Sequence, residues 1–90
     1  MKTFSLQGDL SFETVAQWWP QLQSQINGEA LSLDLNQVAR ADSAGLALLV
    51  SAMASANERK TSLQLQGAPA QLRQLAKVSG VDHLLPFVGA

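Results

Sequence analysis

Cysteine is absent from this 90-residue sequence, and histidine and charged residues are scarce. Without cysteine the chain can form no disulfide, no thiolate metal site and no thiol nucleophile. His83 is the sole histidine, which is too few for a histidine-based metal site. The six Lys and Arg residues are scattered and the formal net charge is −1, so no basic stripe could neutralise a run of phosphates. We therefore expect no metal, no cofactor and no nucleic-acid partner.

Long apolar runs are also missing. No stretch of roughly 18 apolar residues is present, and the N-terminus MKTFSLQGDL lacks the apolar centre of a secretory signal. These features predict a cytoplasmic protein with no direct membrane insertion. The length and the lack of a Pro- or Ser-rich linker predict a single domain over residues 1–90.

Apolar periodicity predicts an α/β fold. Alternating residues predict strands at 3–8, 31–35 and 62–67, with Gly8-Asp9 as the exit from the first. Helical spacing predicts helices from an N-cap at Ser11 to about Ile26, from Ala44 to Asn57, and over about 69–79. Strand, helix and strand with short connections form a right-handed parallel unit, so we expect a small mixed, partly parallel sheet with helices packed against it.

Two segments are less regular. Pro20 lies inside the first predicted helix, where its missing N–H and its ring predict a kink or a restart near Trp19. The helix is expected to end at Asn27-Gly28. The last ten residues, VDHLLPFVGA, are expected to be irregular or to form a stub strand.

The helix that follows Ser43 carries no charged residue up to Asn57, although surface helices normally do. On a helical wheel one stripe is expected to pack on the sheet: Leu46, Leu49, Val50, Met53 and Ala56. The opposite side is small and weakly polar: Ala44, Ala47, Leu48, Ser51 and Ser55. Such a surface is easily desolvated and favours docking of another protein. Alternatively, the first helix or the C-terminal tail covers it, or it is simply an exposed Ala/Ser face.

Ser43 allows more than one role. Its hydroxyl is predicted to cap the helix, and Asp42 beside it could also cap. The run A-D-S-A-G differs by one residue from a G-x-S-x-G nucleophile elbow. Seven residues separate Leu35 from Ser43, however, whereas an elbow joins strand and helix directly, and Ala41 stands in place of the first glycine. We therefore expect no enzyme, and no role for His83 as a base.

These residues resemble the STAS domain, the family named for sulphate transporters and anti-sigma factor antagonists. The resemblance lies in the strand LSLDL, the loop NQVARA, the motif from Asp42 to Gly45 and the helix LALLVSAMASA. The strand SLQLQG and the helix QLRQLAKVSG follow in the same order as in the family, so the resemblance spans about Leu6 to Phe87. The resemblance implies a STAS-like fold that binds other proteins.

Two branches of the family differ in what they imply. Anti-sigma factor antagonists are phosphorylated on the serine that corresponds to Ser43 and dock a kinase. The small STAS subunit of the Mla system is similar in its D-[ST]-x-G-L-A-L-L run and its short length. It binds the cytoplasmic ATPase of an ABC-type phospholipid transporter that maintains outer-membrane lipid asymmetry. Brevity and the apolar helix favour the transporter branch, and a small-molecule-binding STAS module is a third class.

The transporter branch implies a protein held at the inner membrane through its partner. The predicted partner-binding residues lie in the loop and on the uncharged helix: Arg40, Asp42, Ser43, Ala44, Ala47, Leu48 and Ser51. Ser43 is the candidate phosphorylation site.

Overall fold

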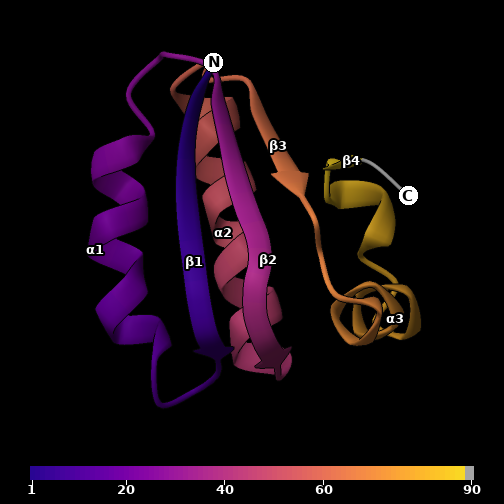
Figure 1. Ribbon diagram of the computed structural model, residues 1–90. Coiled ribbons are helices and arrows are strands. Elements are labelled where there is room, and N and C mark those ends of the chain that lie inside the picture. Colours follow the sequence, from indigo (N-terminus) through magenta and orange to yellow (C-terminus); the bar gives the residue numbers. More distant parts are fainter. Residues whose placement is uncertain (89–90) are drawn as a thin grey trace.

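The computed structural model describes residues 1–88, in which strands and helices alternate (Figure 1). The elements are β1 (Lys2–Leu10), α1 (Val15–Gln25), β2 (Leu31–Ala41), α2 (Ser43–Glu58), β3 (Leu63–Gln66), α3 (Ala70–Val78), a 3₁₀ turn η1 (Asp82–Leu84) and β4 (Phe87–Val88). The predicted α/β class is confirmed.

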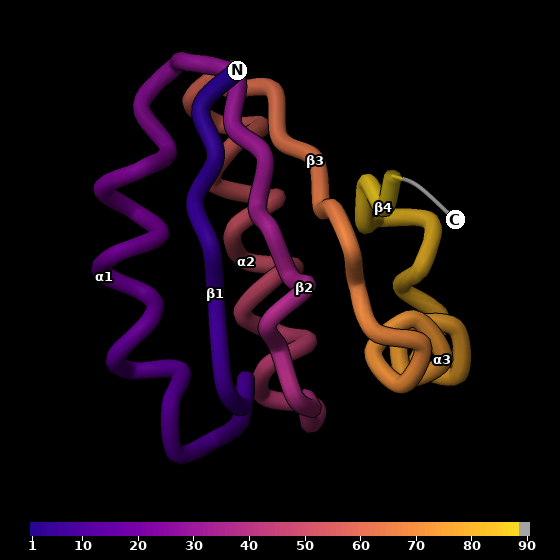
Figure 2. Tube along the Cα trace, in the orientation of Figure 1, coloured from indigo at the N-terminus to yellow at the C-terminus, as the bar shows by residue number. Residues whose placement is uncertain are grey.

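Within residues 1–88 the sheet has the order β1-β2-β3-β4, and every pair of neighbouring strands is parallel. The expected parallel pairing of 31–35 with 62–67 is confirmed, whereas the expectation of a mixed sheet is wrong for these residues. β3 pairs with only the first four residues of β2 and then turns away toward α3 (Figure 2). The carboxyl-terminal half of β2 therefore pairs with a strand only on its β1 side, and at its other edge the Gln71 side chain of α3 accepts the Ala41 N–H at 3.0 Å and donates to the Ala41 carbonyl at 2.8 Å.

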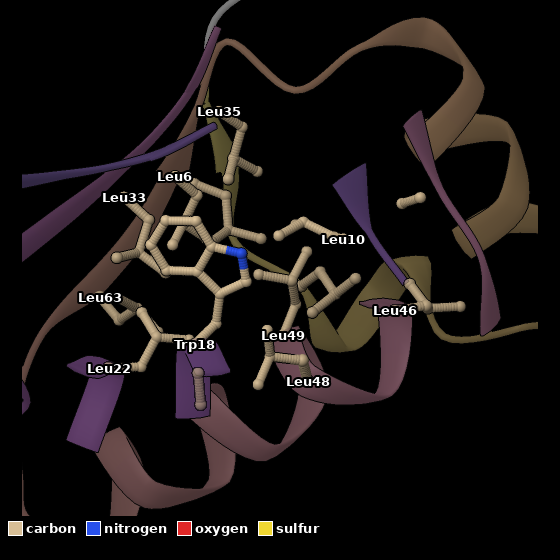
Figure 3. Packing of buried hydrophobic residues seen from close by; sticks show 14 of the residues in the cluster. Leu6, Leu10, Trp18, Leu22, Leu33, Leu35, Leu46, Leu48, Leu49 and Leu63 are labelled. Atoms are coloured by element: carbon tan, nitrogen blue, oxygen red, sulfur yellow. The ribbon is translucent and has the colours of Figure 1, made fainter. Parts of the chain in front are cut away.

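The core lies between the sheet and the helices. Alternate strand residues such as Leu31, Leu33 and Leu35 are buried, as the alternation predicted. Figure 3 shows the indole of Trp18 lying among core leucines such as Leu6 and Leu33, and Trp18 meets Phe4 edge to face with 6.4 Å between ring centroids. Neighbouring Trp19 is half-buried, because successive residues of a helix point in different directions.

The first two strands are longer than predicted. β1 continues through Gly8-Asp9 to Leu10, so the expected exit is wrong: Gly8 takes a φ of +77° beside register shifts in the pairing with β2. β2 includes the NQVARA segment, which was expected to be a loop, because its residues pair with β1 as far as Leu10 opposite Ala41.

The first helix begins later than predicted and is continuous. Its N-cap is Thr14, which makes no side-chain capping bond, so the expected cap at Ser11 is wrong. Ser11 instead closes a turn in which its carbonyl accepts the N–H of Thr14 and of Val15. α1 continues through exposed Pro20, so a restart near Trp19 is also wrong. The end at Asn27-Gly28 is confirmed by a C-cap at Ile26.

The third helix and the tail follow the prediction closely. Leu72 and Ala76 are buried, whereas Val78 is 74% exposed at the last turn of α3. The predicted stub strand is β4, where Phe87 pairs with Leu65. Arg73 holds this strand: its guanidinium lies 5.0 Å from the Phe87 ring centroid and donates to the Val88 carbonyl at 3.3 Å. The rest of the predicted tail, residues 89–90, lies outside the described residues.

Candidate functional site

The candidate site lies where β2 ends and α2 begins. β2 extends to Ala41 and α2 starts at Ser43, so Asp42 is the one residue between them. The residues that open α2 therefore stand at the carboxyl edge of a parallel sheet, where α/β folds expose their functional groups.

Asp42, and not Ser43, caps this helix. One carboxylate oxygen, Oδ1, accepts the N–H groups of Ala44 at 2.9 Å and Gly45 at 3.1 Å. The extended backbone of Asp42 suits an N-cap, whereas Ser43 is already the first helical residue and is exposed. The predicted Ser43 cap is therefore wrong, and the alternative of an Asp42 cap is confirmed.

The same carboxylate also binds the β1–α1 turn. Its second oxygen, Oδ2, accepts the backbone N–H of Phe12 at 3.1 Å. The N–H donors of Gly45, Phe12 and Ala44 stabilise the charged form and hold the pKa of Asp42 below its ordinary value. Asp42 is thus an anion that joins the start of α2 to a turn thirty residues away in sequence.

The geometry around Ser43 does not make it a nucleophile. The argument against an elbow from the seven residues between Leu35 and Ser43 is wrong, because β2 does not end at Leu35 but extends to Ala41. An elbow, however, needs a strained backbone, and among the described non-glycine residues only Lys60 has a positive φ. His83 borders a hollow with Val50 and Asn57, which are about 10 Å or more along α2 from Ser43 at 1.5 Å per residue.

Gly45 has a steric role in the motif. A Cβ built there would overlap the carbonyl oxygen of Leu10 and would lie 2.7 Å from its carbonyl carbon. The first turn of α2 therefore packs directly on the backbone of β1, and the motif requires glycine at this position.

A shallow apolar groove of about 400 Å³ runs between α1 and α2. Four predicted partner-binding residues line its α2 side: Ala44, Ala47, Leu48 and Ser51. The α1 side, which sequence reasoning missed, consists of Val15, Ala16 and Trp19. Two features of the sequence could have indicated these residues. Val15 and Trp19 are four residues apart and so share one face of the helix, and the adjacent Trp18 and Trp19 cannot both face the core.

Leu48 is placed differently from the prediction. It is 5% exposed and lies beside Leu49 in the core (Figure 3), so its expected position on an exposed face is wrong. α1 packs against α2 and widens the buried arc of the helix to include Leu48 and Ala52. The alternative that the first helix covers this surface therefore holds for Leu48, while Ala47 and Ser51 stay exposed.

Arg40 lies apart from the groove. Its side chain is 79% exposed, and its Nε lies 3.8 Å from a carboxylate oxygen of Asp9. The two residues border a hollow with Glu13 and Asp42 at the end of the sheet. The structure thus places the predicted residues in two adjoining regions, the apolar groove and this polar end.

Residues 1–88 hold neither a cluster of metal-ligating side chains nor a membrane-spanning helix. No group of three or more His, Cys, Asp or Glu side chains in this part of the chain could hold a metal ion. None of its helices has the length and apolar character needed to cross a membrane.

Comparison with known proteins places the fold in a family. The family described as "Mlab, STAS domain" matches residues 2–86. The chain belongs to this STAS-domain family. No curated protein matches it.

Solved STAS structures share the fold at low sequence identity. A Thermotoga maritima protein described as an anti-sigma factor antagonist has a TM-score of 0.80 at 14% identity, over 98% of this chain and 80% of that one. A sulfate transporter family protein from Wolinella succinogenes has a TM-score of 0.76 at 18% identity, over 96% of this chain and 74% of that one. The phosphorylated Bacillus cell fate determinant SpoIIAA has a TM-score of 0.70 at 16% identity, over 97% of this chain and 81% of that one.

Proposed function

We propose that this STAS protein is a non-enzymatic binding module for the ATPase subunit of an ABC-type phospholipid transporter that maintains outer-membrane lipid asymmetry. The observation that carries the proposal is the uncharged groove between α1 and α2 in a chain of the Mlab-type STAS family. The partner is the cytoplasmic ATPase, and the protein is held at the inner membrane through it.

The composition of the groove supports protein binding. Its α2 side is built from Ala44, Ala47 and Ser51, and the helix has no charged residue up to Asn57. Desolvating such a surface removes few strongly hydrated groups, and the cores of protein interfaces are depleted in charge in the same way. Half-buried Trp19 adds an aromatic side chain to the α1 side, a residue type enriched in binding hot spots.

The groove also explains how binding could regulate the ATPase. A partner element seated in it would contact both helices at once, and would lie beside Ser43 and the Asp42 cap. Binding to a folded ATPase stabilises that form by mass action. The STAS protein therefore stabilises or regulates the ATPase without contacting lipid.

The test is co-purification with the ATPase from the same organism, using two Ala→Glu variants. Ala47→Glu places a charge in the groove at an exposed position. Ala70→Glu places the same charge at an exposed helical alanine on α3, which lies on the other side of α2 from α1 (Figure 1). We expect the first variant to lose the ATPase and the second to retain it. Retention by both variants, or no binding by the wild type, contradicts the proposal.

A second candidate function is an anti-sigma factor antagonist switched by phosphorylation of Ser43. The observation that favours it is the exposure of Ser43 at the first position of α2, in a fold shared with phosphorylated SpoIIAA. A phosphate there would add about −1.5 to −2 charges beside Asp42 and the groove, which would expel a partner packed on it.

Incubation with a cognate anti-sigma kinase and ATP tests this alternative. It predicts one phosphate per chain and none in Ser43→Ala, measured by intact-protein mass spectrometry. An unmodified wild-type protein, under conditions in which a known antagonist is phosphorylated, would exclude the alternative.

A further inference from the structure

We propose that Phe12 is an aromatic anchor of the same interface, and that it inserts into an apolar socket of the partner protein flanked by Lys or Arg side chains. The inference rests on the proposed function and extends the contact surface beyond the groove. Phe12 was not among the residues that the sequence pointed to.

Phe12 is the most exposed large apolar side chain of the described residues, at 80%. Isolated exposed apolar residues are common on protein surfaces, so its position matters more than its exposure. It lies on the turn between β1 and α1, three residues before Val15, which lines the groove. Its N–H donates to Asp42, the residue that precedes Ser43. Phe12 therefore stands at the Ser43 end of the groove.

The turn that carries Phe12 is held at several points. Besides the 3.1 Å bond from its N–H to Asp42, the Thr14 hydroxyl donates to the Asp9 carbonyl at 2.8 Å. The same hydroxyl accepts the N–H of Ser11 at 2.9 Å. A turn that is already ordered loses little conformational entropy on binding, and a preorganised aromatic is the type of residue that dominates interface energies.

The charges around Phe12 indicate the chemistry of the partner. Asp9, Glu13 and Asp42 border the adjoining hollow, with Arg40 as its one cation. Three carboxylates against one guanidinium favour a partner surface that carries cations. The same charges disfavour the anionic headgroups of a membrane surface, so a protein socket is the occupant that fits.

The test measures the affinity of the full chain for the purified transporter ATPase, with the anti-sigma kinase in a parallel arm. Phe12→Ser removes the aromatic ring, and Val78→Ser is the matched control, because Val78 is 74% exposed on α3. We expect Phe12→Ser to weaken Kd by about 10- to 100-fold, the range of a hot-spot residue, and Val78→Ser to change it by less than about twofold. Glu13→Lys should slow association and reduce its salt dependence.

The outcomes separate this inference from the proposed function. If Phe12→Ser binds as the wild type does while Ala47→Glu fails, the groove is the interface and the anchor role is wrong. If the wild type binds neither partner, both proposals fail. Sedimentation with phosphatidylglycerol vesicles that depends on Phe12 would also overturn the inference, because the ring would then insert into lipid.

Discussion

Replacing Gly45 with alanine tests the packing that positions the whole candidate site. In an ordinary helix interior, Gly→Ala stabilises by about 1 kcal/mol, because alanine restricts the unfolded chain and favours the helix. At Gly45 the added methyl would overlap the Leu10 carbonyl oxygen and approach the Leu10 Cβ at 2.8 Å. The obstacle is mainly backbone, so no side-chain rotation can relieve it.

The steric effect should exceed the gain in helix propensity. Overpacking of a core typically destabilises by about 1–3 kcal/mol, and a backbone obstacle places Gly45 at the upper end of that range. Subtracting the propensity gain leaves a net loss of roughly 1–2 kcal/mol, which for a domain of this size lowers Tm by about 4–16 °C.

Thermal unfolding followed by far-UV circular dichroism measures this loss. Ser51→Ala is the control, because Ser51 is exposed on the same helix and its substitution changes propensity without adding a contact. We expect a slightly higher Tm for Ser51→Ala and a clearly lower one for Gly45→Ala. A Gly45→Ala protein as stable as the wild type would refute the close approach of α2 to β1.

Three further predictions concern the residues around this packing. Asp42→Ala should lower Tm more than Ser43→Ala, because Asp42 accepts the capping N–H groups; equal melting curves would contradict the assigned cap. Because the pKa of the Asp42 carboxyl is lower in the folded chain than its ordinary value of 3.8, the ionised carboxylate stabilises the fold at pH values above 3.8. This stability is lost as the pH falls through the folded-state pKa, so at acidic pH the Tm of Asp42→Asn should depend less on pH than that of the wild type. Leu48→Glu should unfold the domain, as measured by Trp fluorescence, because Leu48 is buried; a folded variant would place Leu48 at the surface.

Local patterns predicted the parallel arrangement and the presence of each helix, and contacts between elements decided the details that were missed. The wheel for α2 placed Leu48 outward because the position of α1 is not encoded in that helix alone. β2 was predicted to end at Leu35 because the exposed polar residues after it read as a loop. Their strand conformation comes from pairing with β1, which is a contact distant in sequence.

Sequence reasoning left the choice of cap between Asp42 and Ser43 open, and it did not single out Phe12. Asp42 and Ser43 are both good N-cap residues, and the choice between them depends on where β2 ends. Phe12 was not recognised because its link to Asp42 joins two turns that only the folded chain brings together. Trp19 could have been assigned to the groove from the tryptophan pair, since only one of the two can face the core.

Site-specific photo-crosslinking tests the central claim, that the partner docks in the groove between α1 and α2, most directly. A photoreactive amino acid at Ala47, at Ala16 or at Ala70 samples the two sides of the groove and a distant helix, all at exposed positions. On irradiation with the transporter ATPase present, we predict crosslinks from the positions of Ala47 and Ala16 and none from that of Ala70. Crosslinks from Ala70 alone, with neither groove position reacting, would contradict the account.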